Sequence, residues 1–186
     1  MDAFWEWWPD LYKDLHTFRI TGGEPLLGWQ RSYEELLSHP GLEDIRNITF
    51  ETNGTQTLQP KFIDFLQDWT DVPGHELTFS VSPKLSCSGE NHEEAIKPEV
   101  IRQYQETGFV YLKFVVASED DVQEAQEAVK EYKQGGFNGP VYLMPVGGVE
   151  SVYSMNAKNV ALAAMKLGYR YSDRLQVPLF KNEWGT

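Results

Sequence analysis

The sequence predicts an α/β protein with a mostly parallel sheet built from βα units. Runs of apolar, β-branched or aromatic residues recur about every thirty residues along the chain. Helix-like stretches separate these runs, and each run is short enough to be a strand. Strands and helices that alternate at this spacing form right-handed crossovers and a parallel sheet. Six such strands indicate either an open sheet or a partial barrel.

The expected strands are rich in Val, Ile, Phe, Tyr and Thr, which favour a pleated and buried surface. The last of them is unusually polar for a buried strand, because Arg174 and Gln176 lie on one of its faces. The six segments are 17–21, 47–52, 77–82, 110–116, 141–146 and 171–179.

The expected helices carry recognisable start and stop signals. Ser32 with Glu35 three residues later has the pattern of a capping box, and Pro60 suits a first helical turn. Ser118 is the expected cap of a helix that has acids in its first turn, and Gly108 is the expected stop of the helix before it. The helical segments are 32–39, 59–69, 97–108, 118–136 and 154–169.

Length and charge restrict the classes of protein to consider. The 186 residues suit a single domain spanning 1–186, and no apolar run approaches the roughly 20 residues that a membrane span needs. The net charge is −12, without the basic cluster that binding to nucleic acid requires. The aromatic, acidic beginning is unlike a signal peptide. We therefore expect a cytoplasmic protein that binds neither nucleic acid nor membrane.

Cysteine and histidine give no metal site. Cys87 is the one cysteine, so neither a disulfide nor a multi-cysteine site can form within the chain, and a small apolar filler is its commonest role. The four histidines show no paired metal-ligand spacing, and we expect them at the surface. No Ser-His-Asp arrangement and no phosphate-binding glycine loop of the Walker type is present.

Polar residues follow the first three strands, where parallel α/β folds bind ligands. The first is followed by "TGGEP" (21–25), the second ends in "ETNGT" (51–55), and the third ends in "SVSPK" (80–84). Glycine lets a backbone approach a ligand closely, and Glu24 adds a carboxylate. Each motif alone is also explained by a tight turn or a surface lysine, so the argument rests on all three together.

The later strands add further candidates. Alternation puts Lys113 on one strand face with Tyr111 and Val115, where it points inward or snorkels to water. Met144 and Pro145 close the fifth strand and offer an apolar edge for an adenine-like ring, although core packing also explains Met144.

Taken in order, these motifs resemble the radical S-adenosylmethionine superfamily, and within it the 7-carboxy-7-deazaguanine synthases. The resemblance implies a partial TIM-like barrel that binds S-adenosylmethionine, a 4Fe–4S cluster and magnesium. It implies that a 5′-deoxyadenosyl radical abstracts a hydrogen from 6-carboxytetrahydropterin, a pterin, whose ring contracts with loss of ammonia in queuosine-type synthesis. The resemblance also implies a reductant protein, and the family is typically dimeric.

The resemblance also assigns roles to residues. Glu24 with Gly23 would hold the methionine amino group, and Met144 with Pro145 would flank the adenine. The implied cofactor-binding residues are Gly23, Glu24, Asn53, Ser82, Pro83, Lys84, Met144 and Pro145, and the implied substrate-binding residues are Thr21, Glu51 and Thr186.

One part of the family pattern is missing from the chain. The family holds its cluster with three cysteines in a loop before "TGGEP", followed by a magnesium-binding threonine, whereas no cysteine precedes Thr21 here. We therefore expect an N-terminally truncated synthase that lacks the first strand and is inactive as it stands, with residues 4–15 forming the helix that follows the cluster loop. The alternatives are a degenerate domain that binds S-adenosylmethionine or a pterin, and an activase for a glycyl-radical enzyme.

Overall fold

The computed structural model describes residues 16–147, 150–174 and 179, and within α7 the side chains from residue 157 onward. The described residues form one six-stranded sheet in the order β1-β2-β3-β4-β5-β6, and every neighbouring pair is parallel. The prediction of a parallel α/β sheet that does not close into a barrel is confirmed. The strands are β1 (Thr17–Ile20), β2 (Asn47–Thr52), β3 (Glu76–Val81), β4 (Phe109–Val116), β5 (Val141–Pro145) and β6 (Arg170–Tyr171).

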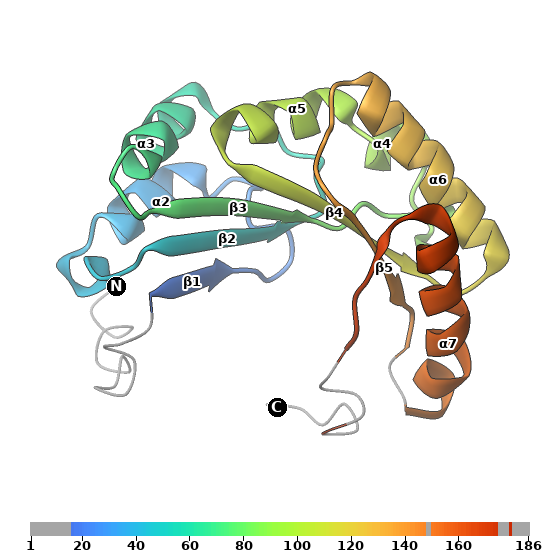
Figure 1. Ribbon diagram of the computed structural model, residues 1–186. Helices are drawn as coiled ribbons and strands as arrows, with labels where there is room; N and C mark the ends of the chain where they lie inside the picture. Colours follow the sequence, from blue (N-terminus) through green and yellow to red (C-terminus); the bar gives the residue numbers. More distant parts are fainter. Residues whose placement is uncertain (1–15, 148–149, 175–178, 180–186) are drawn as a thin grey trace.

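The helices lie along one face of the curved sheet and leave its other face concave (Figure 1). This arrangement is compatible with a partial TIM-like barrel. Among the described residues, no helix combines the length and the apolar character needed to cross a membrane. The helices are α2 (Gln30–Leu37), η2 (Pro40–Leu42), α3 (Pro60–Thr70), η3 (Ser86–Ser88), α4 (His92–Ala95), α5 (Pro98–Thr107), α6 (Glu119–Gln134) and α7 (Glu150–Leu167).

Two predicted helix starts have opposite outcomes. The cap at Ser118 is confirmed: its hydroxyl accepts from the backbone N–H of Asp121, whose carboxylate accepts from the N–H of Ser118, which is a complete capping box. The cap at Ser32 is wrong, because α2 begins two residues earlier with Trp29 as its N-cap and without a side-chain cap. The helix predicted over 4–15 lies outside the described residues.

The end of the sheet also differs from the prediction. A strand was expected over 171–179, but β6 comprises only Arg170 and Tyr171. The backbone N–H of Ser172, just after β6, still donates to the carbonyl of Leu143 on β5, at 2.9 Å. Residues 175–178 of the predicted strand lie outside the described residues.

The core lies between the sheet and the helices and is rich in aromatic rings. Phe79 of β3 stacks on Phe50 of β2 with centroids 5.8 Å apart and on Tyr104 of α5 at 4.5 Å. Phe62 of α3 meets Phe50 edge-on at 6.0 Å. All four residues are fully buried, so they bind the helices to the convex face of the sheet.

The opposite face of the sheet is polar and partly exposed. Along β2 and β4, buried residues alternate with half-exposed ones. The half-exposed set includes Thr49, Glu51, Tyr111 and Lys113, which point away from the helices. This concave face therefore carries the side chains that remain available for a ligand.

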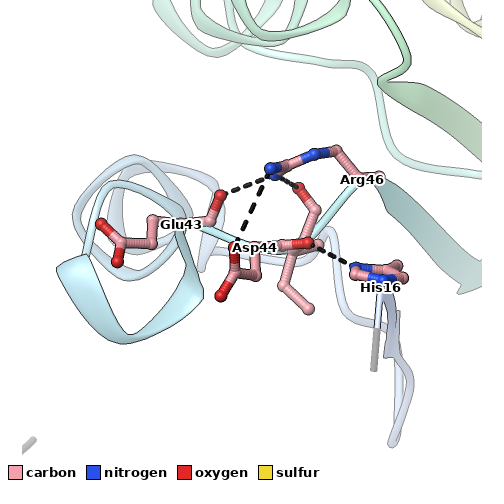
Figure 2. Close-up of polar contacts among 5 residues, drawn as sticks. His16, Glu43, Asp44 and Arg46 are labelled. Carbon is pink, nitrogen blue, oxygen red and sulfur yellow. Dashed lines mark hydrogen bonds and ion pairs between the residues drawn. The ribbon is translucent and has the colours of Figure 1, made fainter. Parts of the chain in front are cut away.

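The N-terminal end of the first two strands is held by a small polar cluster (Figure 2). A hydrogen bond of 3.0 Å joins His16 Nδ1 to the carbonyl of Asp44. The guanidinium of Arg46 donates to the carbonyls of Glu43 and Ile45, at 2.6 and 3.1 Å. These contacts fix the loop that enters β2, at the end of the sheet opposite to the predicted ligand-binding ends.

Candidate functional site

Three of the predicted motifs meet at one rim of the sheet. Because β1, β2 and β3 are parallel neighbours, their carboxyl ends lie side by side. The backbone N–H of Ser82, just after β3, donates to the carbonyl of Thr52 at the end of β2, at 2.8 Å. The loops after these three strands therefore form one continuous surface.

Glu24 connects the first of these loops to the second. Its Oε1 accepts from the Thr52 hydroxyl at 2.7 Å, and its Oε2 accepts from the backbone N–H of Asn53 at 2.7 Å. Oε1 also accepts from the backbone N–H of Leu26 at 3.1 Å. A carboxylate offers about four acceptor positions, so roughly one position of Glu24 remains for a further donor.

The loop after β1 is held around Glu24 by the helix that follows. The hydroxyl of Tyr33 on α2 donates to the carbonyl of Pro25 at 2.7 Å. Burial raises the pKa of Tyr33, and the negative charge of Glu24 raises it further. The phenol therefore stays neutral and keeps its role as a donor. Thr21 and Gly23 are exposed, and no atom lies within 4 Å of the position that a Cβ of Gly23 would take.

The second loop begins with a turn that requires glycine. Gly54 has φ of +81°, and a Cβ there would lie 2.6 Å from Cγ1 of Val81 on β3. The side-chain oxygen of Asn53 accepts from the backbone N–H of Thr55 at 3.0 Å and from its hydroxyl at 2.8 Å. The turn proposed for Asn53 and Gly54 is therefore present, and Asn53 uses its carbonyl oxygen within it.

Gln30 of α2 was not predicted as a site residue, yet its side chain connects the loop after β1 with the segment after β2. Its Nε2 donates to the carbonyls of Leu26 and Thr57, at 3.0 and 2.9 Å. Its Oε1 accepts from the backbone N–H of Gln59 at 2.7 Å, and the side chain is buried. A single glutamine at a helix start has no sequence signature, because its partners lie far along the chain.

The third loop contributes residues of different exposure. The Ser82 hydroxyl donates to the carbonyl of Lys113 on β4, at 3.0 Å, so it joins β3 to β4. Pro83 is buried, whereas the Lys84 side chain is exposed. Lys84 is therefore the residue of this motif whose charge faces solvent at the rim.

Met144 and Pro145 end β5, farther along the same edge of the sheet. Both residues are buried. Nε of Arg174 lies 3.1 Å from the sulfur of Met144, and the guanidinium donates to the carbonyl of Gly147 at 3.1 Å. Arg174 thus covers the end of β5. The remaining predicted substrate contact, Thr186, lies outside the described residues.

Glu51 lies on the concave face and not at the tip of its loop. It is half-exposed, and its Oε1 accepts from the guanidinium of Arg19 on β1 at 3.0 Å. The predicted substrate residue therefore belongs to the sheet surface beneath the rim, where a ligand bound at the rim would project.

The residues present do not fit an iron–sulfur cluster. Three thiolates must converge on such a cluster, and the chain has one cysteine. Cys87 lies exposed in η3, so the expectation of a buried apolar filler is wrong. The pKa of its thiol is raised by partial burial and by the nearby Asp121. Within the described ranges, no group of three or more His, Cys, Asp and Glu side chains is arranged to hold a metal ion.

A separate groove of about 730 Å³ runs between α6 and α7. Its lining is mostly apolar, with Val122, Val160 and Leu167 among its residues. It lies on the helix side of the sheet, opposite to the concave face, and its charged lining residues are Glu119 and Lys166. We therefore place the candidate site at the rim.

Comparisons with known proteins agree with the resemblance. No protein-family model matches the chain. Two curated relatives, each 31% identical, are the 7-carboxy-7-deazaguanine synthases of Pyrobaculum aerophilum and Rhodopirellula baltica. The first match covers 89% of this chain and 66% of the relative, and the second covers 90% and 62%. The chain belongs to the 7-carboxy-7-deazaguanine synthase family.

Membership of this synthase family confirms the resemblance that the ordered motifs predicted. The chain spans slightly less than two thirds of the length of these two synthases. Family membership therefore accounts for the fold and the rim motifs, and the activity of this chain is treated as a proposal.

Proposed function

We propose that this chain is the part of a 7-carboxy-7-deazaguanine synthase that binds S-adenosylmethionine and the pterin 6-carboxytetrahydropterin. One observation carries this proposal: Glu24 is fixed between the ends of β1 and β2 by Thr52 and Asn53, with an acceptor position left over. A fixed carboxylate beside an open glycine backbone suits the ammonium group of an amino acid.

The proposed cofactor contacts follow from the rim geometry. Glu24 would accept from the methionine ammonium, and the open backbone at Gly23 would let the ligand approach. Lys84 would pair with the carboxylate of the cofactor, beside the Ser82–Pro83 turn. The buried edge formed by Met144 and Pro145 would flank the adenine. Asn53 would contact the ribose or the carboxylate through the part of its amide that the turn does not use.

The proposed substrate contacts lie lower, on the concave face. Glu51 would accept hydrogen bonds from the pterin ring, held in place by its ion pair with Arg19. Thr21 would contact the substrate from the rim, and Thr186 from the end of the chain. These residues would orient the substrate and exclude water; no proton transfer is assigned to them.

The redox chemistry must come from groups that these residues do not hold. In a complete synthase, a 4Fe–4S cluster would supply the electron for radical chemistry, and magnesium would assist. With one cysteine in the chain, we propose that the cluster ligands belong to a polypeptide segment outside these 186 residues. For the complete enzyme we propose a cytoplasmic setting, a reductant protein as electron donor and a homodimer.

The same single cysteine favours a second candidate, a binding domain without redox chemistry. It would bind S-adenosylmethionine or a pterin at the same rim. The coding sequence upstream of the Met1 codon distinguishes the two: three clustered cysteine codons in frame support the synthase. Their absence, together with retained binding of S-adenosylmethionine, supports the binding domain.

The proposal is tested by calorimetric titration of S-adenosylmethionine into the wild-type chain and Glu24→Gln. We expect Glu24→Gln to weaken binding about tenfold or more, the scale of a lost hydrogen bond between charged groups. Glu35→Gln, on the exposed side of α2, is the matched control and should bind as the wild type does. Thermal melts of all three proteins verify folding. Equal affinity of Glu24→Gln and wild type would remove Glu24 from the site.

A further inference from the structure

The connection between β3 and α5 is tied to helix α6 at two places. The carboxylate of Glu124 accepts from the backbone N–H of Ser86 at 2.8 Å and from its hydroxyl at 2.6 Å. Farther along the chain, a hydrogen bond of 2.9 Å joins Nε2 of His92 to Oε1 of Glu131. The two glutamates lie seven residues apart, which is about two helical turns, so they share one face of α6. This face of α6 therefore holds the connection at both of its polar contacts.

The first of these contacts lies two residues beyond Lys84, the proposed partner of the cofactor carboxylate. On the other side of Lys84, the backbone N–H of Ser82 donates to the carbonyl of Thr52, and its hydroxyl donates to the carbonyl of Lys113. Directly after Lys84, the side chain of Leu85 is 2% exposed. The exposed side chain of Lys84 therefore extends from a backbone that is fixed on both sides.

The start of α6 is itself held firmly. The capping box of Ser118 and Asp121 fixes its first turn, and the buried Asp121 also accepts from the backbone N–H of Ala117 at 2.7 Å. Glu124 lies about one turn farther along the helix. Because α6 follows β4, its first turns lie at the carboxyl ends of the strands, beside the loop after β3. Glu124 therefore connects a fixed helix start to the loop that carries Lys84.

The contact between Glu124 and Ser86 is suited to setting the position of the loop. Both donors of Ser86 go to one carboxylate, and two hydrogen bonds to a charged acceptor define a direction better than one neutral hydrogen bond does. Since Ser86 is exposed, water screens the contact and limits its contribution to stability. A long lysine side chain loses conformational freedom when it binds, and a backbone that is already fixed lowers this cost.

We propose that Glu124 is a positioning residue for Lys84. By holding Ser86, it keeps the Lys84 ammonium at the rim, where the carboxylate of S-adenosylmethionine binds. Glu124 does not contact the ligand itself. This inference rests on the proposed function and deepens it, because it adds a residue of α6, outside the three rim motifs, to the determinants of cofactor affinity.

The test compares S-adenosylmethionine with its decarboxylated form, which lacks the group that pairs with Lys84. Calorimetry on the wild-type chain should show about tenfold tighter binding of S-adenosylmethionine, the scale of a hydrogen bond between charged groups. Lys84→Met should remove this preference. Glu124→Ala should lower it about threefold, the scale of a weak hydrogen bond, and should leave the binding of the decarboxylated form unchanged.

Further variants separate positioning from charge and from a general loosening of the connection. Glu124→Gln should keep most of the preference, because its amide can accept from the N–H of Ser86 and donate to the hydroxyl. Glu131→Ala is the matched control: it removes the contact with His92 on the same face of α6 and should leave the preference unchanged. Added to Lys84→Met, Glu124→Ala should have no further effect. Thermal melts of all variants verify folding.

Several results would overturn the positioning role and leave the proposed function standing. These are a preference that survives Glu124→Ala, an equal loss in Glu131→Ala or in Glu124→Gln, and equal binding of the two ligands by the wild type. A further loss when Glu124→Ala is added to Lys84→Met would also overturn it, because Glu124 would then act by another route. Failure of the wild type to bind S-adenosylmethionine would refute the proposed function, and the positioning role with it.

Discussion

The hydroxyl of Thr52 donates a hydrogen bond of 2.7 Å to the carboxylate of Glu24, although 28 residues separate them in the chain. The same hydroxyl oxygen accepts from the backbone N–H of Gly54 at 3.1 Å. Thr52 therefore couples the loop after β1 to the turn after β2. The ligand-binding rim is built on this contact, because it fixes the direction in which the Glu24 carboxylate points.

Replacing Thr52 by valine should destabilise the protein while preserving its shape. The variant leaves one oxygen of Glu24 and the buried N–H of Gly54 without this partner, which costs about 1–3 kcal/mol. Urea denaturation measures the loss. Thr49→Val, in the same strand and without a hydroxyl hydrogen bond to any described residue, is the control and should change the free energy of unfolding by less. Equal effects of the two substitutions would contradict the role of Thr52.

Substituting alanine at Gly54 should be more harmful than at Gly74. Both glycines have positive φ, at +81° and +88°, so alanine is strained equally in each. Only at Gly54 would the new Cβ meet a neighbour, Cγ1 of Val81 at 2.6 Å. We expect an additional loss of about 1–3 kcal/mol for Gly54→Ala, measured by denaturant unfolding. Similar losses at both positions would show that β3 yields to the added methyl group.

Gly23→Ala should separate folding from binding. No atom lies within 4 Å of the new Cβ and φ is not in the left-handed region, so the melting temperature should stay close to that of the wild type. The methyl group would nevertheless occupy the surface that the proposed cofactor approaches. Calorimetry should show weaker binding of S-adenosylmethionine. A variant that binds as tightly as the wild type would place the ligand elsewhere.

The stability of the protein should depend on pH through Lys113. Burial lowers its pKa below the ordinary value, so between the lowered value and about 10.4 the unfolded chain binds the extra proton. Raising the pH through this window therefore favours the folded state, and the cost of the charged ammonium is present below it. Lys113→Met should be more stable than the wild type at neutral pH, with a difference that shrinks as the pH rises. A constant difference measured by urea denaturation at several pH values would contradict the lowered pKa.

The sequence predicted those parts of the fold that depend on local patterns. The runs at 47–52 and 110–116 became β2 and β4 because alternating apolar residues suffice to define a half-buried strand. The Ser118 cap was predictable because its partner, Asp121, lies three residues away. The rim was predictable because parallel neighbours bring successive strand ends together.

Features with distant partners could not be predicted. Helix α2 begins at Gln30, whose side chain is held by Thr57 and Gln59, and this overrides the local capping pattern at Ser32. The grouping of Arg19, Glu51 and Lys113 could not be predicted either, because these residues belong to three strands whose register sets their distances. The outward position of Cys87 follows from the short helix η3, for which the sequence has no clear signal.

A crystal structure of the chain soaked with S-adenosylmethionine tests the central claim most directly. The account predicts the methionine ammonium within hydrogen-bond distance of the Glu24 carboxylate, with the adenine against Met144 and Pro145 at the end of β5. Density for the ligand in the groove between α6 and α7, with the rim left unchanged, would contradict it.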